Sequence, residues 1–322
     1  MQSAYIGKLM ELAESDVKVI HALADSGTGY DEMFRLNFPE QIYNFGISEE
    51  HMVAAAAGMA TMGYIPFVYT AGAFLAYRSL EFIRDDICFQ NFNVKIVGMG
   101  SGLSWSSLGP THHTTEDVAV LRAMPNLVLL SPATPRQVAA CVDAAYEHEG
   151  PVYIRIGMNH EQEFFDEGYK LTIGRNDVLQ DNGDISIFTT GSILSEVQEA
   201  VKLLEHDGYR MNVINVPSVK PLDDENILGM AAKSKMLFTV EEHNILGGLG
   251  SIVSEVIAGA GLGIPVKRIG LNDLFAKGYG THAAVRKENN LHAKGIYRQI
   301  REALYERIQI GRYRRGTYRI LQ

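Results

Sequence analysis

A short apolar strand that leads into a helix of small residues most constrains how this chain can fold. Residues 42–47 form an apolar run typical of a strand, and Gly46 lets the backbone turn sharply at its end. Residues 52–60 then supply a helix made almost entirely of Ala, Gly, Met and Val. A helix this poor in polar side chains is predicted to be buried, and its small residues allow close packing against another element.

Two carboxylates and an imidazole, Glu49, Glu50 and His51, stand where this helix begins. Acidic side chains are common at helix starts because they offset the positive end of the helix dipole, so capping is one interpretation. A carboxylate that faces a buried apolar surface can instead serve as a poised acid or base. The residues alone leave both interpretations open.

Apolar strands and helical segments alternate along the chain, which predicts mostly parallel, doubly wound α/β sheets. Two such domains are expected, residues 1–160 and 184–304, joined by a polar linker at 161–183 and followed by a basic tail at 305–322. The predicted strands are 17–24, 42–47, 65–69, 94–98, 126–130, 151–155, 185–188, 211–216, 236–240 and 265–269. The predicted helices are 4–15, 71–92, 136–148, 194–207, 224–234, 251–260 and 288–304.

Length and composition narrow the class of protein. A chain of 322 residues suits two domains rather than one core. The net charge of −9 argues against nucleic-acid or membrane-surface partners, and no apolar run approaches membrane-spanning length. The start lacks a signal-peptide pattern. Cys88 and Cys141 lie in apolar helical segments and are predicted to be core residues of a cytoplasmic protein, not metal ligands or a disulfide.

Two loops follow predicted strands, at the sheet edge where α/β proteins bind ligands. Residues 25–29 make Asp25 and Ser26 candidates for substrate contacts. Residues 100–113 form a loop whose length is typical of a functional segment. A third segment, the glycine-rich turn 247–250, lacks both the P-loop Lys and the full dinucleotide fingerprint, so close helix packing is the favoured interpretation.

Arg and Tyr residues are interleaved in the tail at 305–322. Single-strand nucleic-acid binders show such interleaving. One short tail on an acidic protein supports that function only weakly, so we favour an arm that lies on a partner subunit.

Three segments of the first half carry a family resemblance: Asn44 to Glu49 with the following small-residue helix, Thr70 to Tyr77, and Gly109-Pro-Thr-His112. In this order and at this spacing they resemble the thiamine-diphosphate-dependent transketolases and deoxyxylulose-phosphate synthases. The similarity runs from about residue 5 to about residue 305 and corresponds to the second half of a transketolase. It implies a pyrimidine-binding domain followed by a smaller C-terminal domain.

The resemblance implies roles for five side chains. Thiamine diphosphate performs the difficult chemistry, while the protein supplies geometry and proton control. Glu49 matches the family carboxylate that hydrogen-bonds to the pyrimidine ring, and His112 matches a histidine near the cofactor's amino group, suited to proton transfer or oxyanion contact. Phe74 and Tyr77 match ring-stacking aromatics, although their spacing would also suit plain core residues. Leu80 occupies the position of the family's third aromatic.

One departure from the family concerns the metal and the diphosphate. The Gly-Asp-Gly segment with which the family holds Mg²⁺ and the diphosphate occurs nowhere in this chain. The resemblance therefore implies a separate N-terminal transketolase subunit that holds both, in an α2β2 heterotetramer. This chain alone would be inactive.

A second departure concerns the substrate. Gly100 and Leu108 stand where transketolases carry a histidine and an acidic residue, while Trp105 and the neighbouring serines offer other contacts. Arg155 aligns with an arginine of the synthase pattern and could bind an anion or form a strand-end salt bridge. We infer a ketose donor other than xylulose phosphate, with sulfo-sugars and branched (apulose-type) sugar phosphates as candidates by analogy, and an aldose acceptor.

Two other functions fit parts of the pattern. The β component of a 2-oxoacid dehydrogenase shares the two-domain layout, but Gly-Pro-Thr-His followed by Thr-Glu-Asp favours a transketolase. A non-catalytic regulatory subunit would keep the fold without the chemistry. The joint presence of Glu49, Phe74, Tyr77 and His112 argues against that function.

Overall fold

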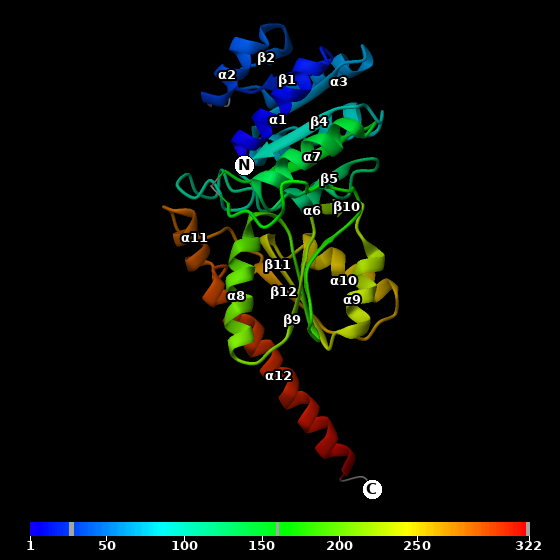
Figure 1. Ribbon diagram of the computed structural model, residues 1–322, viewed down its shortest axis with the longest axis vertical. Helices are drawn as coiled ribbons and strands as arrows, with labels where there is room; N and C mark the ends of the chain where they lie inside the picture. The colour runs from blue at the N-terminus through cyan, green and yellow to red at the C-terminus, as the bar shows by residue number, and fades with distance from the viewer. Residues whose placement is uncertain (26–28, 159–160, 320–322) are drawn as a thin grey trace.

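Two α/β domains follow one another along the chain, as predicted, and lie at opposite ends of the main body (Figure 1). The computed structural model describes residues 1–25, 29–158 and 161–319, with side chains described as far as Glu306. Cys88 and Cys141 are buried and free, in agreement with their prediction as core residues. Among the helices of the described ranges, none is both long and apolar enough to cross a membrane.

The first domain is built on a seven-stranded sheet with the order β10-β5-β6-β4-β3-β1-β2. Its strands pair in parallel except β10, which runs antiparallel to β5. The carboxyl ends of the parallel strands therefore meet at one edge of the sheet. The strands are β1 (Val19–Leu23), β2 (Ile42–Asn44), β3 (Ile65–Ala71), β4 (Lys95–Met99), β5 (Val128–Leu130), β6 (Val152–Ile156) and β10 (Ser218–Lys220).

Helices cover both faces of this sheet, because alternate strand residues point to opposite sides. In β3, Phe67 and Tyr69 join the core formed with α1 and α7, whereas Val68 joins the core formed with α3 and α4. The helices are α1 (Gln2–Ser15), α2 (Gly29–Asn37), a 3₁₀ turn (Pro39–Gln41), α3 (Glu49–Thr61), α4 (Gly72–Arg78), α5 (Leu80–Phe82), a π-helical segment (Ile83–Cys88), α6 (Asp117–Leu121) and α7 (Pro135–Glu147).

The second domain has a five-stranded sheet with the order β12-β11-β8-β9-β7, parallel except for β7 against β9. Helices α8 and α12 cover one face, and α9 and α10 cover the other. The strands are β7 (Asp177–Asp181), β8 (Ile185–Thr189), β9 (Met211–Asn215), β11 (Met236–Asn244) and β12 (Val266–Leu271). The helices are a 3₁₀ turn (Gly191–Ile193), α8 (Leu194–His206), α9 (Asp224–Lys233), α10 (Leu249–Gly259), α11 (His282–Glu288) and α12 (Ala293–Arg319).

Several elements differ from the sequence prediction. The helix expected over 71–92 breaks at Ser79, whose backbone (φ −90°, ψ 14°) leaves the helical region. The polar linker contains β7, and α2, α6, β10 and α11 were not predicted, because such short segments show too little periodicity. The closing helix starts at Ala293 rather than residue 288 and runs on through the tail to Arg319, so that α12 projects beyond the second domain (Figure 1). That it is an arm for a partner subunit stays a prediction.

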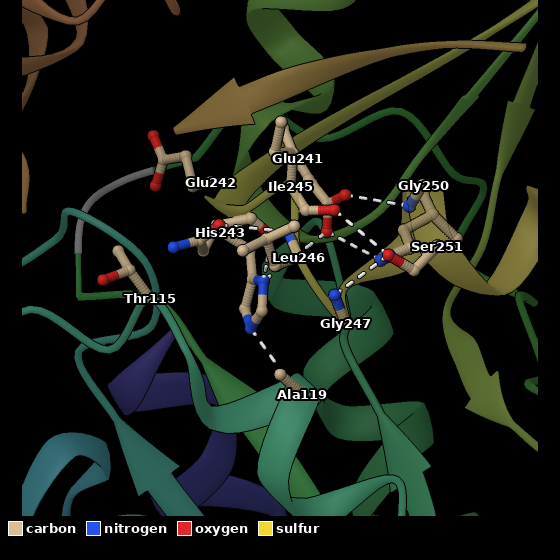
Figure 2. Close-up of polar contacts among 12 residues, drawn as sticks. Thr115, Ala119, Glu241, Glu242, His243, Ile245, Leu246, Gly247, Gly250 and Ser251 are labelled. Carbon is tan, nitrogen blue, oxygen red and sulfur yellow. Dashed lines mark hydrogen bonds and ion pairs between the residues drawn. The ribbon is translucent and has the colours of Figure 1, made fainter. Parts of the chain in front are cut away.

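The glycine-rich turn 247–250 holds a carboxylate of the chain itself. The backbone N–H groups of Leu249 and Gly250 donate to the two carboxylate oxygens of Glu241, at 2.7 and 2.8 Å, and the N–H of Gly247 donates to Ser251 (Figure 2). The first turn of α10 therefore directs its free donors to Glu241. A Cβ built on Gly247 would lie 2.5 Å from the Cβ of Ala119, and one built on Gly250 would lie 2.6 Å from Arg268, so close packing also requires glycine at these positions.

Candidate cofactor and substrate site

Glu49 begins α3 at the carboxyl edge of the first sheet. The loop after β2 turns at Gly46, whose φ of +70° lies in the left-handed region. Only 2% of the Glu49 side chain is exposed, whereas Glu50 is partly exposed and His51 is exposed. Burial thus singles out Glu49 among the three adjacent polar residues.

The carboxylate of Glu49 and the ring of Phe74 share one partner, Arg78. Arg78 Nη1 donates to Glu49 Oε2 at 3.0 Å, and Arg78 Cζ lies 4.6 Å from the centre of the Phe74 ring. Phe74 and Arg78 are four residues apart on α4, so they project from the same face of the helix. A planar hydrogen-bond donor therefore fits between the carboxylate and the aromatic face.

His112 completes this group of side chains from the loop after β4. Its ring lies 5.0 Å from the ring of Phe74 and 6.2 Å from the ring of Trp105, edge-on to both. Thr111 Oγ1 is 2.9 Å from His112 Nδ1. Among the described residues, neither ring nitrogen of the neighbouring buried His113 has a hydrogen-bond partner, and burial lowers the pKa of His113. The structure thus brings Glu49, Phe74 and His112 together.

Tyr77 and Leu80 are placed differently from Phe74. The Tyr77 hydroxyl donates to Glu116 Oε2 at 2.9 Å and accepts from the Glu116 N–H at 3.0 Å, which ties α4 to the loop that carries His112. Burial, Asp117 and Glu116 together raise the pKa of Tyr77. Leu80 packs against the hydrophobic core formed with α3 and α4. Their assignment to cofactor binding stays a prediction.

The predicted substrate-side residues occupy different environments. A side chain at Gly100 would collide with Trp105, since a Cβ built there lies 1.9 Å from the indole Nε1, and the φ of Gly100 is +82°. The Trp105 ring therefore fills the space beside Gly100. Leu108 is 45% exposed. Ser26 lies outside the described residues.

Arg155 is buried at the end of β6, with 2% of its side chain exposed. Its Nε donates to Asp117 Oδ2 at 2.8 Å, and its Nη2 donates to the carbonyls of Thr114 and Glu242 at 2.8 and 3.0 Å. Burial opposes the charge of the guanidinium, but the adjacent Asp117 carboxylate raises the pKa of Arg155. Of the two interpretations left open above, the geometry is that of the strand-end salt bridge.

A second buried cluster joins the domains next to Arg155. Glu242 of β11 is bonded to Arg286, and its Oε1 lies 2.9 Å from Nε2 of His282. Burial alone would raise the pKa of Glu242, but Arg286 and His282 hold it below its usual range. The N–H of Ala119 lies 3.4 Å from Nε2 of His243 (Figure 2), a further polar contact between the domains. The N–H of Leu103, in the loop that carries His112, donates to Glu242 Oε2 at 3.2 Å and bonds this loop to the second domain.

Three side chains at the site carried no signal that identified them in the sequence. Arg78 and Glu116 contact the predicted cofactor residues, and only the four-residue spacing of Phe74 and Arg78 could have indicated a contact. The buried His113 is visible only once the loop is folded. Among the described residues, no group of three or more His, Cys, Asp or Glu side chains is arranged to hold a metal ion.

Comparisons with known proteins agree with this fold. Residues 1–160 match the family model of the transketolase pyrimidine-binding domain, and residues 174–296 match that of the transketolase C-terminal domain. The chain therefore carries these two transketolase domains one after the other. The chain belongs to the transketolase family.

Its relatives include separate subunits of about its own size. It is 34% identical to an apulose-4-phosphate transketolase subunit of Actinobacillus succinogenes, over 90% of this chain and 94% of that protein. It is 31% identical to a 6-deoxy-6-sulfo-D-fructose transketolase subunit of Clostridium sp. strain MSTE9, over 94% of each. A solved split-gene transketolase, described as an inactive β4 tetramer, is 35% identical with a TM-score of 0.85, over 94% of this chain and 97% of that one.

Proposed function

We propose that this chain is the pyrimidine-binding half of a two-chain, thiamine-diphosphate-dependent transketolase. The complex would move a two-carbon ketol unit from a ketose to an aldose. One observation carries the proposal: a buried carboxylate, Glu49, and the aromatic face of Phe74 lie close enough to share a planar partner, with His112 beside them. These are the groups that a protonatable heteroaromatic ring requires.

Each of these side chains has a task that its environment suits. Bound thiamine diphosphate supplies a carbon nucleophile that can carry the ketol unit. The Glu49 carboxylate would accept a hydrogen bond from the pyrimidine ring, and its burial strengthens that bond by excluding water. Phe74 would pack against the ring face, and His112 would hold or move a proton at the substrate oxygen. Tyr77, bonded to Glu116, would fix the His112 loop against α4.

The partner would be an N-terminal transketolase subunit. This chain lacks the Gly-Asp-Gly segment, and its relatives include proteins named as single subunits of a transketolase. The solved β4 assembly of a split-gene transketolase is inactive, which agrees with a need for another chain. We propose an α2β2 heterotetramer in the cytoplasm, in which the partner holds Mg²⁺ and the diphosphate.

The donor would be an atypical ketose, such as a sulfo-sugar or a branched sugar phosphate. Two relatives are named for apulose 4-phosphate and for 6-deoxy-6-sulfo-D-fructose. Gly100 lacks a side chain and Leu108 lacks a charge, so neither can bind the hydroxyls that a histidine and a carboxylate would bind. Trp105 occupies the space beside Gly100 and would shape the donor pocket instead.

The first experiment co-expresses this chain with an N-terminal transketolase subunit encoded beside it and assays ketol transfer from a panel of ketoses. We expect transfer that needs both chains and thiamine diphosphate, with a sulfo-sugar or a branched sugar phosphate as the preferred donor. Decarboxylation of a 2-oxoacid without ketol transfer from any ketose would replace the proposal with a dehydrogenase component.

A substitution pair tests the carboxylate itself. Glu49→Gln should lower kcat of the complex by at least about 100-fold, because the amide cannot exchange the proton that the ring requires. Glu50→Gln, which changes the adjacent and partly exposed carboxylate, should stay within about twofold of wild type. Full activity of Glu49→Gln would remove Glu49 from the catalytic machinery.

A further inference from the structure

Arg78 makes both of the contacts that the proposed function assigns to the cofactor ring. Its guanidinium donates to the buried Glu49 carboxylate at 3.0 Å and lies over the face of Phe74, with Cζ 4.6 Å from the ring centre. A guanidinium is planar, carries N–H donors and stacks on aromatic rings. An aminopyrimidine protonated on its ring shares these three properties. The two groups therefore compete for the same place.

We propose that Arg78 occupies the pyrimidine site of the cofactor-free chain and has to leave when the cofactor binds. The inference rests on the proposed function, because it takes Glu49 and Phe74 as the ring's partners. It makes Arg78 a determinant of cofactor affinity that contacts the ring's partners and not the reacting atoms.

The burial of the two partners explains why the empty site needs such a side chain. Glu49 is 2% exposed, and a buried carboxylate without a partner is costly. The Arg78 side chain, by contrast, is 49% exposed, so its guanidinium can swing into solvent without crossing packed protein. The buried Glu49 carboxylate thus requires a counter-ion. Because Arg78 is partly exposed, the cofactor ring can replace it in that role.

The expected size of the competition follows from the kinds of contact. A partly exposed ion pair and a cation–π contact each favour the arrangement in which Arg78 occupies the site by a factor of roughly two to five. The cofactor has to displace both contacts, so the two factors multiply and removing Arg78 should tighten binding by roughly 4- to 25-fold. Arg78→Lys keeps the positive charge but lacks the planar guanidinium, so it should tighten cofactor binding by less.

The test measures thiamine diphosphate affinity in the complete complex. Thiamine diphosphate is titrated, with Mg²⁺ present, into the two-chain complex by isothermal titration calorimetry. Arg78→Met should lower the Kd of thiamine diphosphate by roughly 4- to 25-fold. Arg84→Met is the matched control, since Arg84 lies six residues further on and pairs with the exposed Asp85, and its Kd should equal that of wild type.

Thermal unfolding supplies a second readout on the same proteins. Without cofactor, Arg78→Met should melt below wild type because Glu49 loses its counter-ion. The upward shift of Tm on saturation with thiamine diphosphate should be larger for the variant, because no internal contact has to break. If Arg78→Met does not fold, Arg78→Gln keeps an amide donor for Glu49 without the charge and is expected to tighten binding as well.

The outcomes separate this inference from the proposed function. An unchanged or higher Kd for a folded Arg78 variant would overturn the displacement while leaving the transketolase proposal intact. Absence of thiamine diphosphate binding to the wild-type complex would overturn the proposed function, and the displacement with it.

Discussion

Burial separates side chains that look equivalent in the sequence. Glu49 and Glu50 are adjacent carboxylates at a helix start, yet only Glu49 turns into the protein, towards α4. No local pattern distinguishes them, because a one-residue step rotates the side chain by about 100° around the helix. The family resemblance selected Glu49 in advance. Its partner Arg78 is 29 positions away in the sequence and could not be predicted without the fold.

Lys95 shows what burial does to a charge remote from the site. The side chain is fully buried at the start of β4, and its Nζ donates to the carbonyls of His148 and Gly150 at 2.7 and 2.8 Å. Burial lowers the pKa of Lys95 to about 7. An unfolded lysine has a pKa of about 10.4, so between these values only the unfolded chain binds the proton. Stability is therefore expected to rise with pH across this range.

The prediction concerns the slope of the free energy of unfolding against pH. From pH 7 to pH 9 the free energy of unfolding of wild type should rise by about 1 kcal/mol per pH unit more than that of Lys95→Met. The variant should also be less stable at pH 9, since two carbonyls lose their donor. Urea unfolding at several pH values measures both effects. Parallel slopes would show that Lys95 stays protonated in the folded chain.

At the scale of elements, strands were the easier part to predict. The strands of both sheet centres were found because buried parallel strands are continuous apolar runs. The elements that the sequence did not predict are mostly short ones such as β7, β10 and α11, whose few residues show no distinct hydrophobic period. The break of the predicted 71–92 helix at Ser79 depends on packing that no propensity records.

Two glycine substitutions should have opposite effects on stability. Gly100→Ala places a Cβ 1.9 Å from Trp105 Nε1 at a positive φ, so it should cost about 2 kcal/mol or more and shift the indole. Gly58→Ala lies in the exposed part of α3, where no atom of the described residues is within 4 Å of the added Cβ, and should gain about 0.5–1 kcal/mol of stability. Urea unfolding followed by fluorescence reports both, because Trp105 is the chain's single tryptophan. An unchanged emission spectrum in Gly100→Ala would contradict the first expectation.

At the scale of the whole molecule, the two domains depend on one another. Strand β10 follows the second domain's β9 in the chain yet pairs with β5 of the first sheet, and Arg155 of β6 donates to the carbonyl of Glu242 in β11. The sequence pattern indicated two separate units. It could not reveal this exchange, because strand pairing depends on contacts distant in sequence.

A fragment of residues 1–173 should therefore be unstable by itself. It would leave the edge of β5 unpaired and remove the Glu242 carbonyl from the buried Arg155. We expect a broad thermal transition, measured by circular dichroism, and aggregation on size exclusion, whereas the full chain should melt cooperatively. A cooperative transition at the midpoint of the full chain would show that the first domain folds independently.

The position of β10 also has a consequence for biosynthesis. Domains commonly fold in order as the ribosome releases them, the N-terminal one first. Here the first sheet receives its last strand only after Lys220 has been translated and has left the ribosome. Until then the nascent chain carries an unpaired β5 edge, so a pause in translation shortly before this point would prolong the interval in which the protein needs a chaperone.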